Sequence, residues 1–520
     1  MSTLQAQVSF ERLIRADDEP HNWLTYSGTT FSQRHSKLAQ ITPDNVSRLE
    51  LQWVYQVRSR EPSSTKFEAT PLVVDGVMYT VQPPNDVVAL DAGTGRVLWT
   101  KEYTPAAAAR LCCGRVNRGV ALHGNTLFLG TIDGHLLALD AKDGRTIWDV
   151  ALARPEAGYA ITHAPLIVKN MVIVGPAGGE YGIRGFLAAF DVDTGKELWR
   201  FDTVPGPGEP GSDSWSGESW KTGGASIWMT GSYDPETNLT YWGTGNPGPV
   251  WNGDNREGDN LYTDSVVALD ADTGKLKWHF QFTPHDEFDW DAAQVPVLAD
   301  IAWQGRSRKV MFWANKNGFF YVLDRTTGEF LLGKPFVDVN WANGLDARGR
   351  PIRVASVTPQ TGGSSVAVIP MYGTNWYSPS FSPVTGLFYI PAFANRKSLV
   401  VKEAVTYVEG QRFIGGGPRP TDQPGYGAVR AVVPATGAMA WEFKMNGPTT
   451  SGVLTTASNV LFTGGREGSF YALDARTGVP LWKATIGAAT ERGPMTYSIG
   501  GRQYVAVASG SALFTFALRQ

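Results

Sequence analysis

Short stretches of alternating hydrophobic and polar residues run through most of the chain, and they predict an all-β protein. In "TPLVVDGVMYTV" and "GVALHGNTLFLGTIDGHLLAL" the alternation is interrupted at Asp75-Gly76, His123-Gly124 and Asp133-Gly134. Side chains along a strand point alternately to its two faces, and such glycine-containing pairs favour tight turns. We therefore expect short strands paired through tight turns.

One sequence motif recurs along the chain and marks a structural repeat. It consists of an apolar run, then Asp-x-x-Thr-Gly or a variant of it, then a second apolar run that ends in tryptophan. The copies end at Trp99, Trp148, Trp199, Trp278 and Trp482, worn copies end at Trp441 and Leu332, and a partial copy ends at Trp53. The anchors from Trp53 to Trp199 lie about 46 to 51 residues apart, which is typical of β-propeller blades.

These eight copies predict an eight-bladed β-propeller of four-stranded blades, with residues 1–520 as a single domain. Each repeat tryptophan should dock between neighbouring blades and bury apolar surface worth about 2 kcal/mol or more. The C-terminal "SALFTFAL" should pair beside the N-terminal strands and close the ring. Longer gaps from Trp199 to Trp278 and from Leu332 to Trp441 predict inserted loops, which on a propeller often build a site.

Composition and charge narrow the classes of function. The chain has 58 glycines, 32 prolines and a formal net charge of -3, without a run of basic residues. This balance argues against a nucleic-acid or membrane-surface role. No apolar run approaches the roughly 18 residues of a membrane-spanning helix, so we expect no membrane span. The N-terminal residues lack a signal-peptide pattern, so we expect any export signal to be absent or already removed.

Five stretches depart from the repeat and are the candidates for chemistry. The first holds both cysteines of the chain, Cys112 and Cys113. They are too close for a Cys-x-x-Cys metal site, and without Cys-x-x-Cys-His we expect no haem on this chain. Neighbouring Cα atoms lie about 3.8 Å apart, below the usual disulfide range of about 4.4 to 6.8 Å. A strained disulfide ring and two buried free cysteines therefore both remain open.

Two further stretches place ligand-binding groups in constrained loops. In "GPAGGEYGIRG" the backbone from Ala177 to Gly179 can approach a ligand closely, and Glu180 adds a carboxylate. In "GTGNPG" Asn246 lies between glycine and proline. Its side-chain oxygen suits a hard cation, although capping a turn is the commoner role of asparagine there.

The last two stretches carry most of the unusual charge. "TPHDEFDWDAAQ" contains Asp286, Glu287, Asp289 and Asp291 within six positions. If its end is extended, Asp289 and Asp291 project to the same side, where two carboxylates repel unless a cation lies between them. A solvated loop is the alternative for Asp286 and Glu287. Lys316, between two asparagines at a strand edge, would by itself be an ordinary solvated lysine.

Together these motifs resemble the quinoprotein alcohol dehydrogenases, eight-bladed propellers that use pyrroloquinoline quinone (PQQ) and a metal ion. The likeness runs from "ERLIRADDEPHNWLTYSG" to "FTFAL". Its most specific parts are the adjacent cysteines followed by "VNR", together with "GTGNP" and "PHDEFD". The resemblance implies that Cys112 and Cys113 form a disulfide on one face of the quinone, and that Trp228 in "GASIWMTGS" stacks on the other.

The resemblance also implies the rest of the site. Glu180, Asn246 and Asp289 would bind the metal, and Asp289 would also take the proton of the alcohol. An aspartate two positions later, here Asp291, is typical of the lanthanide-dependent subgroup, so we expect a lanthanide rather than calcium. Lys316 would lie near the reactive carbonyl. The other cofactor-holding residues would be Glu68, Arg118, Thr162, Ala177, Gly178, Gly179, Ser226, Asn375 and Trp376.

The implied activity is oxidation of an alcohol to an aldehyde or ketone, with electrons passing to a separate soluble cytochrome c. An adjacent-cysteine disulfide agrees with an oxidising compartment, and the family suggests the periplasm. One alternative is a non-catalytic propeller scaffold of the same superfamily; another is an aldehyde, polyol or polymeric-alcohol dehydrogenase using the same site. The sequence specifies neither the alcohol nor the oligomeric state, and a homodimer is compatible with it.

Overall fold

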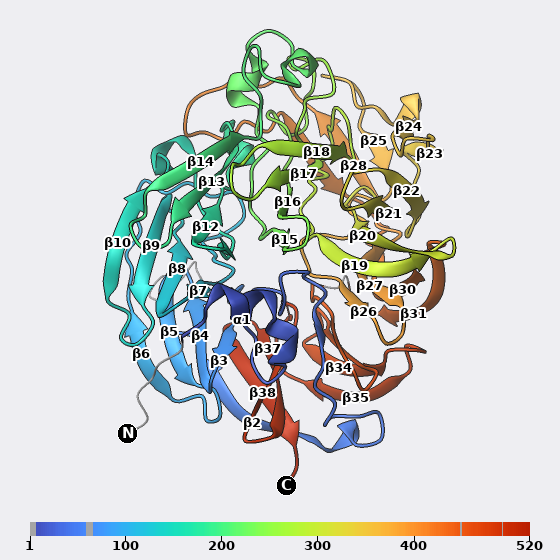
Figure 1. Ribbon diagram of the computed structural model, residues 1–520. Helices are drawn as coiled ribbons and strands as arrows, with labels where there is room; N and C mark the ends of the chain where they lie inside the picture. Colours follow the sequence, from blue (N-terminus) through green and yellow to red (C-terminus); the bar gives the residue numbers. More distant parts are fainter. Residues whose placement is uncertain (1–6, 59–65, 448–449, 491) are drawn as a thin grey trace.

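The computed structural model describes residues 7–58, 66–447, 450–490 and 492–520, and these fold almost entirely into strands and loops (Figure 1). The predicted all-β fold is confirmed. Helical structure in the described ranges is limited to α1 (Phe10–Ile14) and the 3-10 turns η1 (Ala16–Asp18), η2 (Val46–Arg48), η3 (Pro155–Ala157), η4 (Gly179–Tyr181), η5 (Ser212–Ser214), η6 (Ser219–Thr222) and η7 (Ala355–Val357). None of the helices described is long and apolar enough to cross a bilayer.

Eight sheets of four or five strands, counted over the described residues, surround a common centre, consistent with the eight predicted blades (Figure 1). Four of them comprise β3 (Leu72–Val74), β4 (Val77–Gln82), β5 (Asp86–Asp91) and β6 (Val97–Lys101); β7 (Ala121–His123), β8 (Thr126–Gly130), β9 (His135–Asp140) and β10 (Thr146–Ala151); β11 (Leu166–Val168), β12 (Met171–Val174), β13 (Phe186–Asp191) and β14 (Glu197–Asp202); and β15 (Ser232–Asp234), β16 (Leu239–Gly243), β17 (Ser265–Asp270) and β18 (Leu276–Gln281).

The other four sheets draw on the second half of the chain and on two N-terminal strands. They comprise β19 (Val297–Trp303), β20 (Arg306–Ala314), β21 (Phe319–Asp324) and β22 (Phe330–Pro335); β26 (Ser380–Ser382), β27 (Leu387–Ala394), β30 (Tyr426–Val433) and β31 (Ala438–Met445); β32 (Leu454–Thr456), β33 (Val460–Gly464), β34 (Ser469–Asp474) and β35 (Pro480–Thr485), with β1 (His35–Ser36) beside β32; and β36 (Met495–Ile499), β37 (Arg502–Ser509) and β38 (Ala512–Leu518), with β2 (Leu49–Gln56) beside β38.

The antiparallel pairing of β2 with β38 closes the ring as predicted, with Leu49 opposite Leu518 and Gln56 opposite Ala512. The longer gaps also carry insertions as expected. The gap after Trp199 contains η5 and η6. The gap after Leu332 contains two small sheets, formed by β23 (Ala342–Leu345) and β24 (Pro351–Arg353), and by β25 (Val366–Val368), β28 (Ser398–Lys402) and β29 (Gly416–Pro420).

Repeat tryptophans pack against the turn glycine of the following sheet. A Cβ on Gly95, whose φ is +72°, would lie 2.6 Å from the Trp53 ring, and one on Gly274 would lie 2.4 Å from the Trp199 ring. Real Cβ atoms do not come so close, so these contacts require glycine. Gly144, Gly195, Gly328 and Gly478 receive Trp99, Trp148, Trp278 and Trp441 in the same way. The predicted docking between neighbouring blades is confirmed at these positions.

Strand direction decides which loops meet at each end of the ring. In a four-stranded antiparallel sheet, the loop between the second and third strands leaves at the same end as the connection to the next sheet. The Asp-x-x-Thr-Gly turns join third to fourth strands and therefore lie at the opposite end. We call these the loop end and the turn end. The predicted site residues lie at the loop end. Some are in connections between sheets: Cys112, Arg118, Thr162, Trp228, Asp289 and Asp291. Others are in loops between second and third strands: Glu180, Asn246 and Lys316.

Candidate functional site

A cavity of about 280 Å³ opens among the loops of the loop end, and most of the predicted residues line it. These lining residues are Glu68, Cys112, Cys113, Arg118, Thr162, Ala177, Gly178, Glu180, Ser226, Trp228, Asp289, Asp291, Lys316, Asn375 and Trp376. Gly179 and Asn246 lie directly behind the wall: a Cβ on Gly179 would be 3.2 Å from Oδ1 of Asn246 and 3.3 Å from Oγ of Ser226. The fold therefore gathers all of the predicted residues around one cavity.

Cys112 and Cys113 are joined by a disulfide, with their Cα atoms 3.8 Å apart. The predicted pairing is confirmed, and the alternative of two free cysteines is wrong. The carboxylate of Glu180 lies nearby, since one of its oxygens is within 4.8 Å of both sulfur atoms. A rigid sulfur platform and a potential metal ligand thus face the same cavity.

Asp289 and Asp291 converge on Lys316, the only lysine that contacts them in the described structure. Nζ of Lys316 is 2.8 Å from Oδ1 of Asp291 and 3.4 Å from Oδ2 of Asp289. Lys316 is only 3% exposed, so the interpretation of Lys316 as an ordinary solvated lysine is wrong. The backbone differs from the extended form considered above, because Asp289 has a φ of +60°. The two carboxylates meet through a turn rather than through strand alternation.

The neighbouring carboxylates shape this turn and are not solvated. Asp286 accepts hydrogen bonds from the backbone N–H of Phe288, at 3.0 Å, and of Trp290, at 2.8 Å. Glu287 is buried and accepts one from Nζ of Lys402 at 2.7 Å. The solvated-loop alternative for Asp286 and Glu287 is therefore wrong. Asp286 bonds the two residues that flank Asp289, and so holds Asp289 toward the cavity.

One side of the cavity gathers the carboxylates of Glu180, Asp289 and Asp291. Burial raises the pKa of Asp289 well above its usual value, against the opposing effect of Lys316, and the charge of Asp291 adds to the rise. Burial, with a further contribution from Asp291, also raises the pKa of Glu180. The pKa of Asp291 itself is lowered, because Lys316 and the indole of Trp228 outweigh its burial. Two carboxylates that share one ammonium, with Glu180 on the same cavity, make an attractive place for a cation.

The aromatic wall is tied to both the acidic cluster and the opposite side of the cavity. Nε1 of Trp228 donates to Oδ2 of Asp291 at 2.8 Å. The Arg118 guanidinium carbon lies 5.2 Å from the centre of the Trp228 ring and 4.6 Å from that of Trp376. Arg118 also pairs with Glu68 at 3.1 Å and donates to Oγ1 of Thr162 at 3.0 Å. This network fixes the orientation of the indole.

Three residues at the site were not found from the sequence. The hydroxyl of Tyr372 donates to Oδ2 of Asp289 at 2.7 Å, and its ring lies 4.7 Å from Nζ of Lys316. Nη2 of Arg412 donates to the carbonyl of Cys112 at 2.6 Å, and Arg492 lies 3.3 Å from Glu68. Tyr372 is three residues before Asn375, so proximity to a predicted residue could have suggested it. Arg412 comes from an inserted loop with no repeat to place it.

The residues present fit a planar quinone and one hard cation. The side chains of Glu180, Asn246, Asp289 and Asp291 offer oxygen atoms, the ligands that calcium and lanthanide ions prefer. The disulfide and the Trp228 indole both line the cavity and supply apolar surfaces for a flat ring. Gly178 has no room for a side chain, since a Cβ there would be 2.1 Å from the carbonyl oxygen of Gly158.

Comparison with known proteins gives a consistent set of relatives. Residues 23–340 and 421–505 match the family model described as PQQ glucose/ethanol/alcohol dehydrogenase, beta-propeller domain. The chain is 39% identical to quinoprotein alcohol dehydrogenase PedH of Pseudomonas putida, over 97% of this chain and 89% of the relative. It is 41% identical to quinohemoprotein alcohol dehydrogenase ADH IIB of Pseudomonas putida, over 98% and 76%.

Among solved structures, a europium-containing methanol dehydrogenase superposes with a TM-score of 0.92 at 32% identity. The superposition covers 98% of this chain and 100% of that protein. The propeller, including its loop end, is therefore shared over the whole length of a metal-containing dehydrogenase.

Proposed function

The chain belongs to the PQQ glucose/ethanol/alcohol dehydrogenase β-propeller family, and we propose that it is a periplasmic quinoprotein dehydrogenase that oxidises an alcohol to an aldehyde or ketone. One observation carries the proposal. The adjacent-cysteine disulfide, Trp228, and the oxygen ligands Glu180, Asp289 and Asp291 come from four different sheet connections and loops, yet line one cavity. A scaffold that had lost its cofactor would have no use for this combination.

The residues divide the chemistry among them. PQQ, when bound, would supply the hydride acceptor, and the disulfide and Trp228 would hold its ring in the cavity. Asp289 removes the hydroxyl proton of the alcohol, while Lys316 is a fixed cation that stabilises negative charge in the cavity. A carboxylate beside a cation is a weakened base, so its placement must compensate. The Tyr372 hydrogen bond contributes by fixing the direction of the Asp289 carboxylate.

We propose that the bound ion is a lanthanide rather than calcium. Glu180, Asp289 and Asp291 bring three negative charges, and Lys316 offsets only one of them. This surplus favours a trivalent over a divalent ion, and the europium-containing relative supports the choice. Activity of PQQ-loaded protein measured with lanthanum, cerium or calcium tests it; equal or better activity with calcium would contradict the lanthanide assignment.

The electron acceptor is proposed to be a separate soluble cytochrome c. The sequence contains no Cys-x-x-Cys-His, so we propose that this chain binds no covalent haem. The relative ADH IIB is called a quinohemoprotein, and this chain covers 76% of its length. A haem-specific stain of the purified chain, and reduction of added cytochrome c by alcohol, would test both points.

A substrate screen tests the activity itself. Protein loaded with PQQ and lanthanum is mixed with primary, secondary and aromatic alcohols, aldehydes and polyols, and an artificial electron acceptor reports turnover. We expect quinone absorption in the loaded protein and oxidation of simple alcohols. Absence of quinone absorption would instead favour the non-catalytic scaffold, and a preference for aldehydes or polyols would change the substrate class.

A further inference from the structure

Arg256 connects two of the three loops that carry the proposed metal ligands: the loop of Asn246 and the loop of Asp289 and Asp291. Its side chain is completely buried, with 0% of its surface exposed. Nε and Nη2 donate to the carbonyl oxygen of Pro249 at 3.2 and 3.1 Å, and Nη2 also donates to that of Asp286 at 2.5 Å. Nη1 donates to Oδ1 of Asn260 at 2.8 Å. One guanidinium thus bridges backbone atoms of two separate loops.

Both bridged carbonyl groups lie close in sequence to proposed ligands. Pro249 is three residues after Asn246, and Asp286 is three residues before Asp289. The carboxylate of Asp286 then bonds the backbone on both sides of Asp289, as described above. A displacement of the Asp286 backbone is therefore passed directly to the turn that carries Asp289.

The Asn246 loop is held from its other side by the segment before Trp228. The N–H of Ala225 donates to the carbonyl of Asn246 at 3.0 Å, and that of Gly245 donates to Ser226 at 2.8 Å. The Asn246 loop therefore has one fixed edge toward Trp228. On its other side it meets the loop of Asp289 and Asp291, where the N–H of Ala292 donates to the carbonyl of Thr244 at 3.0 Å and Arg256 adds a side-chain bridge.

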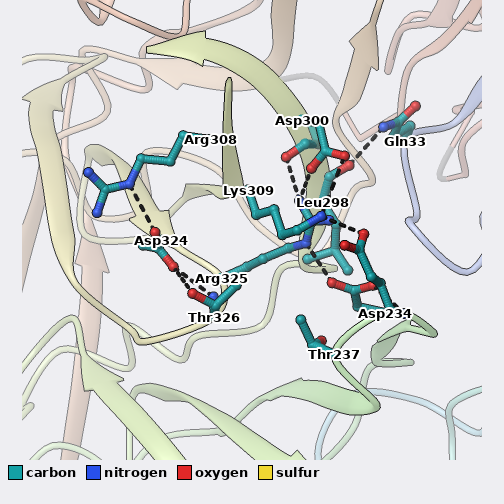
Figure 2. A network of polar contacts seen from close by, with 12 residues as sticks. Gln33, Asp234, Thr237, Leu298, Asp300, Arg308, Lys309, Asp324, Arg325 and Thr326 are labelled. Atoms are coloured by element: carbon teal, nitrogen blue, oxygen red, sulfur yellow. Dashed lines mark hydrogen bonds and ion pairs between the residues drawn. The ribbon is translucent and has the colours of Figure 1, made fainter. Parts of the chain in front are cut away.

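The hydrogen bonds of Arg256 differ from those of another fully buried arginine. Arg325 donates to the carboxylates of Asp234 at 2.8 Å and Asp300 at 2.5 Å (Figure 2). The hydrogen bonds of Arg256 go to carbonyl and amide oxygens, and burial lowers its pKa to about 10. Its guanidinium therefore fixes backbone positions rather than forming a close pair with a carboxylate.

We propose that Arg256 is a positioning residue for the metal site: together with the direct hydrogen bonds between the loops, it fixes how the Asn246 loop and the Asp289 loop lie relative to one another. The inference rests on the proposed function, because the ion is part of that function. A cation such as calcium needs its oxygen ligands at about 2.3 to 2.6 Å, so small shifts of one loop weaken binding. Removal of outer groups that orient metal ligands commonly costs about 10- to 100-fold in metal affinity.

The test measures terbium binding to the PQQ-loaded protein through luminescence sensitised by nearby tryptophan. Arg256→Lys keeps the charge but cannot bond both loops in the same fork geometry. We expect it to weaken terbium binding by at least about 10-fold while the folded protein retains its circular dichroism spectrum. Arg325→Lys is the matched control: equally buried, it lies at the turn end, so its folded fraction should bind terbium like the unaltered protein.

The outcomes separate the inference from the proposed function. Unchanged terbium affinity in Arg256→Lys, or an equal loss in Arg325→Lys, overturns the positioning role. If Arg256→Lys does not fold, Arg256→Gln takes its place, because its shorter amide side chain likewise cannot bond the carbonyl groups of both Pro249 and Asp286 and should lower terbium affinity similarly. Unaltered protein that binds terbium but oxidises no alcohol overturns only the proposed function. Protein that binds no terbium overturns the positioning role and the lanthanide assignment, and its activity with calcium then decides the proposed function.

Discussion

The two ends of the propeller treat buried charge in opposite ways. At the turn end, Figure 2 shows Arg325 between the carboxylates of Asp234 and Asp300, with Lys309 beside them. Lys309 in turn pairs with Glu236 at 2.5 Å. These residues come from neighbouring sheets, β15 to β18 and β19 to β22, so their pairing fastens one sheet to the next.

At the loop end the balance is different. Glu180, Asp289 and Asp291 surround the cavity, and Lys316 is the cation in contact with two of them. The resulting surplus of negative charge destabilises the metal-free fold, since buried like charges repel. Charge at the turn end is thus paired and stabilises the fold, whereas the surplus charge at the loop end suits the cation that we propose.

The strongest test of this contrast is Asp289→Asn. We expect turnover of the PQQ- and lanthanum-loaded enzyme to fall by roughly 10³-fold or more, because a proton acceptor and a metal ligand are lost together. The metal-free variant should unfold at the same or a higher guanidinium concentration than the unaltered protein, since a repulsive charge is removed. Substantial turnover, or marked destabilisation of the metal-free fold, would contradict the interpretation.

At the turn end, loss of a charged side chain should lower the free energy of unfolding rather than turnover. Arg325→Met leaves Asp234 buried without its guanidinium partner, which typically costs about 3 to 5 kcal/mol in the free energy of unfolding. Denaturant unfolding of the metal-free protein measures the loss. Turnover per folded molecule should be retained; a stable variant would show that the network does not hold the sheets together.

A third change sharpens the role of surplus charge at the loop end. Asp291→Ala removes one of the three carboxylates and leaves Lys316 facing Asp289 alone. We expect the ratio of lanthanum-supported to calcium-supported activity to fall by at least about 10-fold, in line with the effect of altered ligand charge on metal selectivity. Asp291→Asn, which keeps the shape, is the control for lost volume. An unchanged activity ratio in both variants would show that Asp291 does not determine which ion the site prefers.

The smallest expected effect concerns Tyr372. Tyr372→Phe removes the hydroxyl that donates to Asp289 and keeps the ring beside Lys316. A hydrogen bond to a charged group is worth about 1.5 to 3 kcal/mol, so we expect kcat to fall about 10-fold or somewhat more with little change in KM. Steady-state kinetics with one alcohol measures kcat and KM separately. A change confined to KM would assign Tyr372 to substrate binding instead.

Much of the fold could be predicted because one physical unit is repeated. The alternation and the Asp-x-x-Thr-Gly turns predict strand pairs, and the contacts of Trp53 with Gly95 and Trp199 with Gly274 confirm how neighbouring sheets dock. The pairing of β2 with β38 was also predictable, because an incomplete first copy needs a partner.

The site was only partly predictable. Adjacent cysteines and paired aspartates are rare enough to stand out, and the cavity brings them together. The positive φ of Asp289 depends on hydrogen bonds to Asp286, which alternation along a strand does not reveal. Arg256 and Arg412 act through backbone carbonyl groups of distant loops, and sequence spacing carries no signal for such contacts.

The pairing of β2 with β38 also orders events during synthesis. Strand β2 emerges from the ribosome early, but its partner is made only when residues 512–518 appear. Until then the sheet of β2, β36, β37 and β38 is incomplete, and the ring stays open at that sheet. Closure of the ring is therefore a late event, because β2 must wait for residues 512–518 before it can pair.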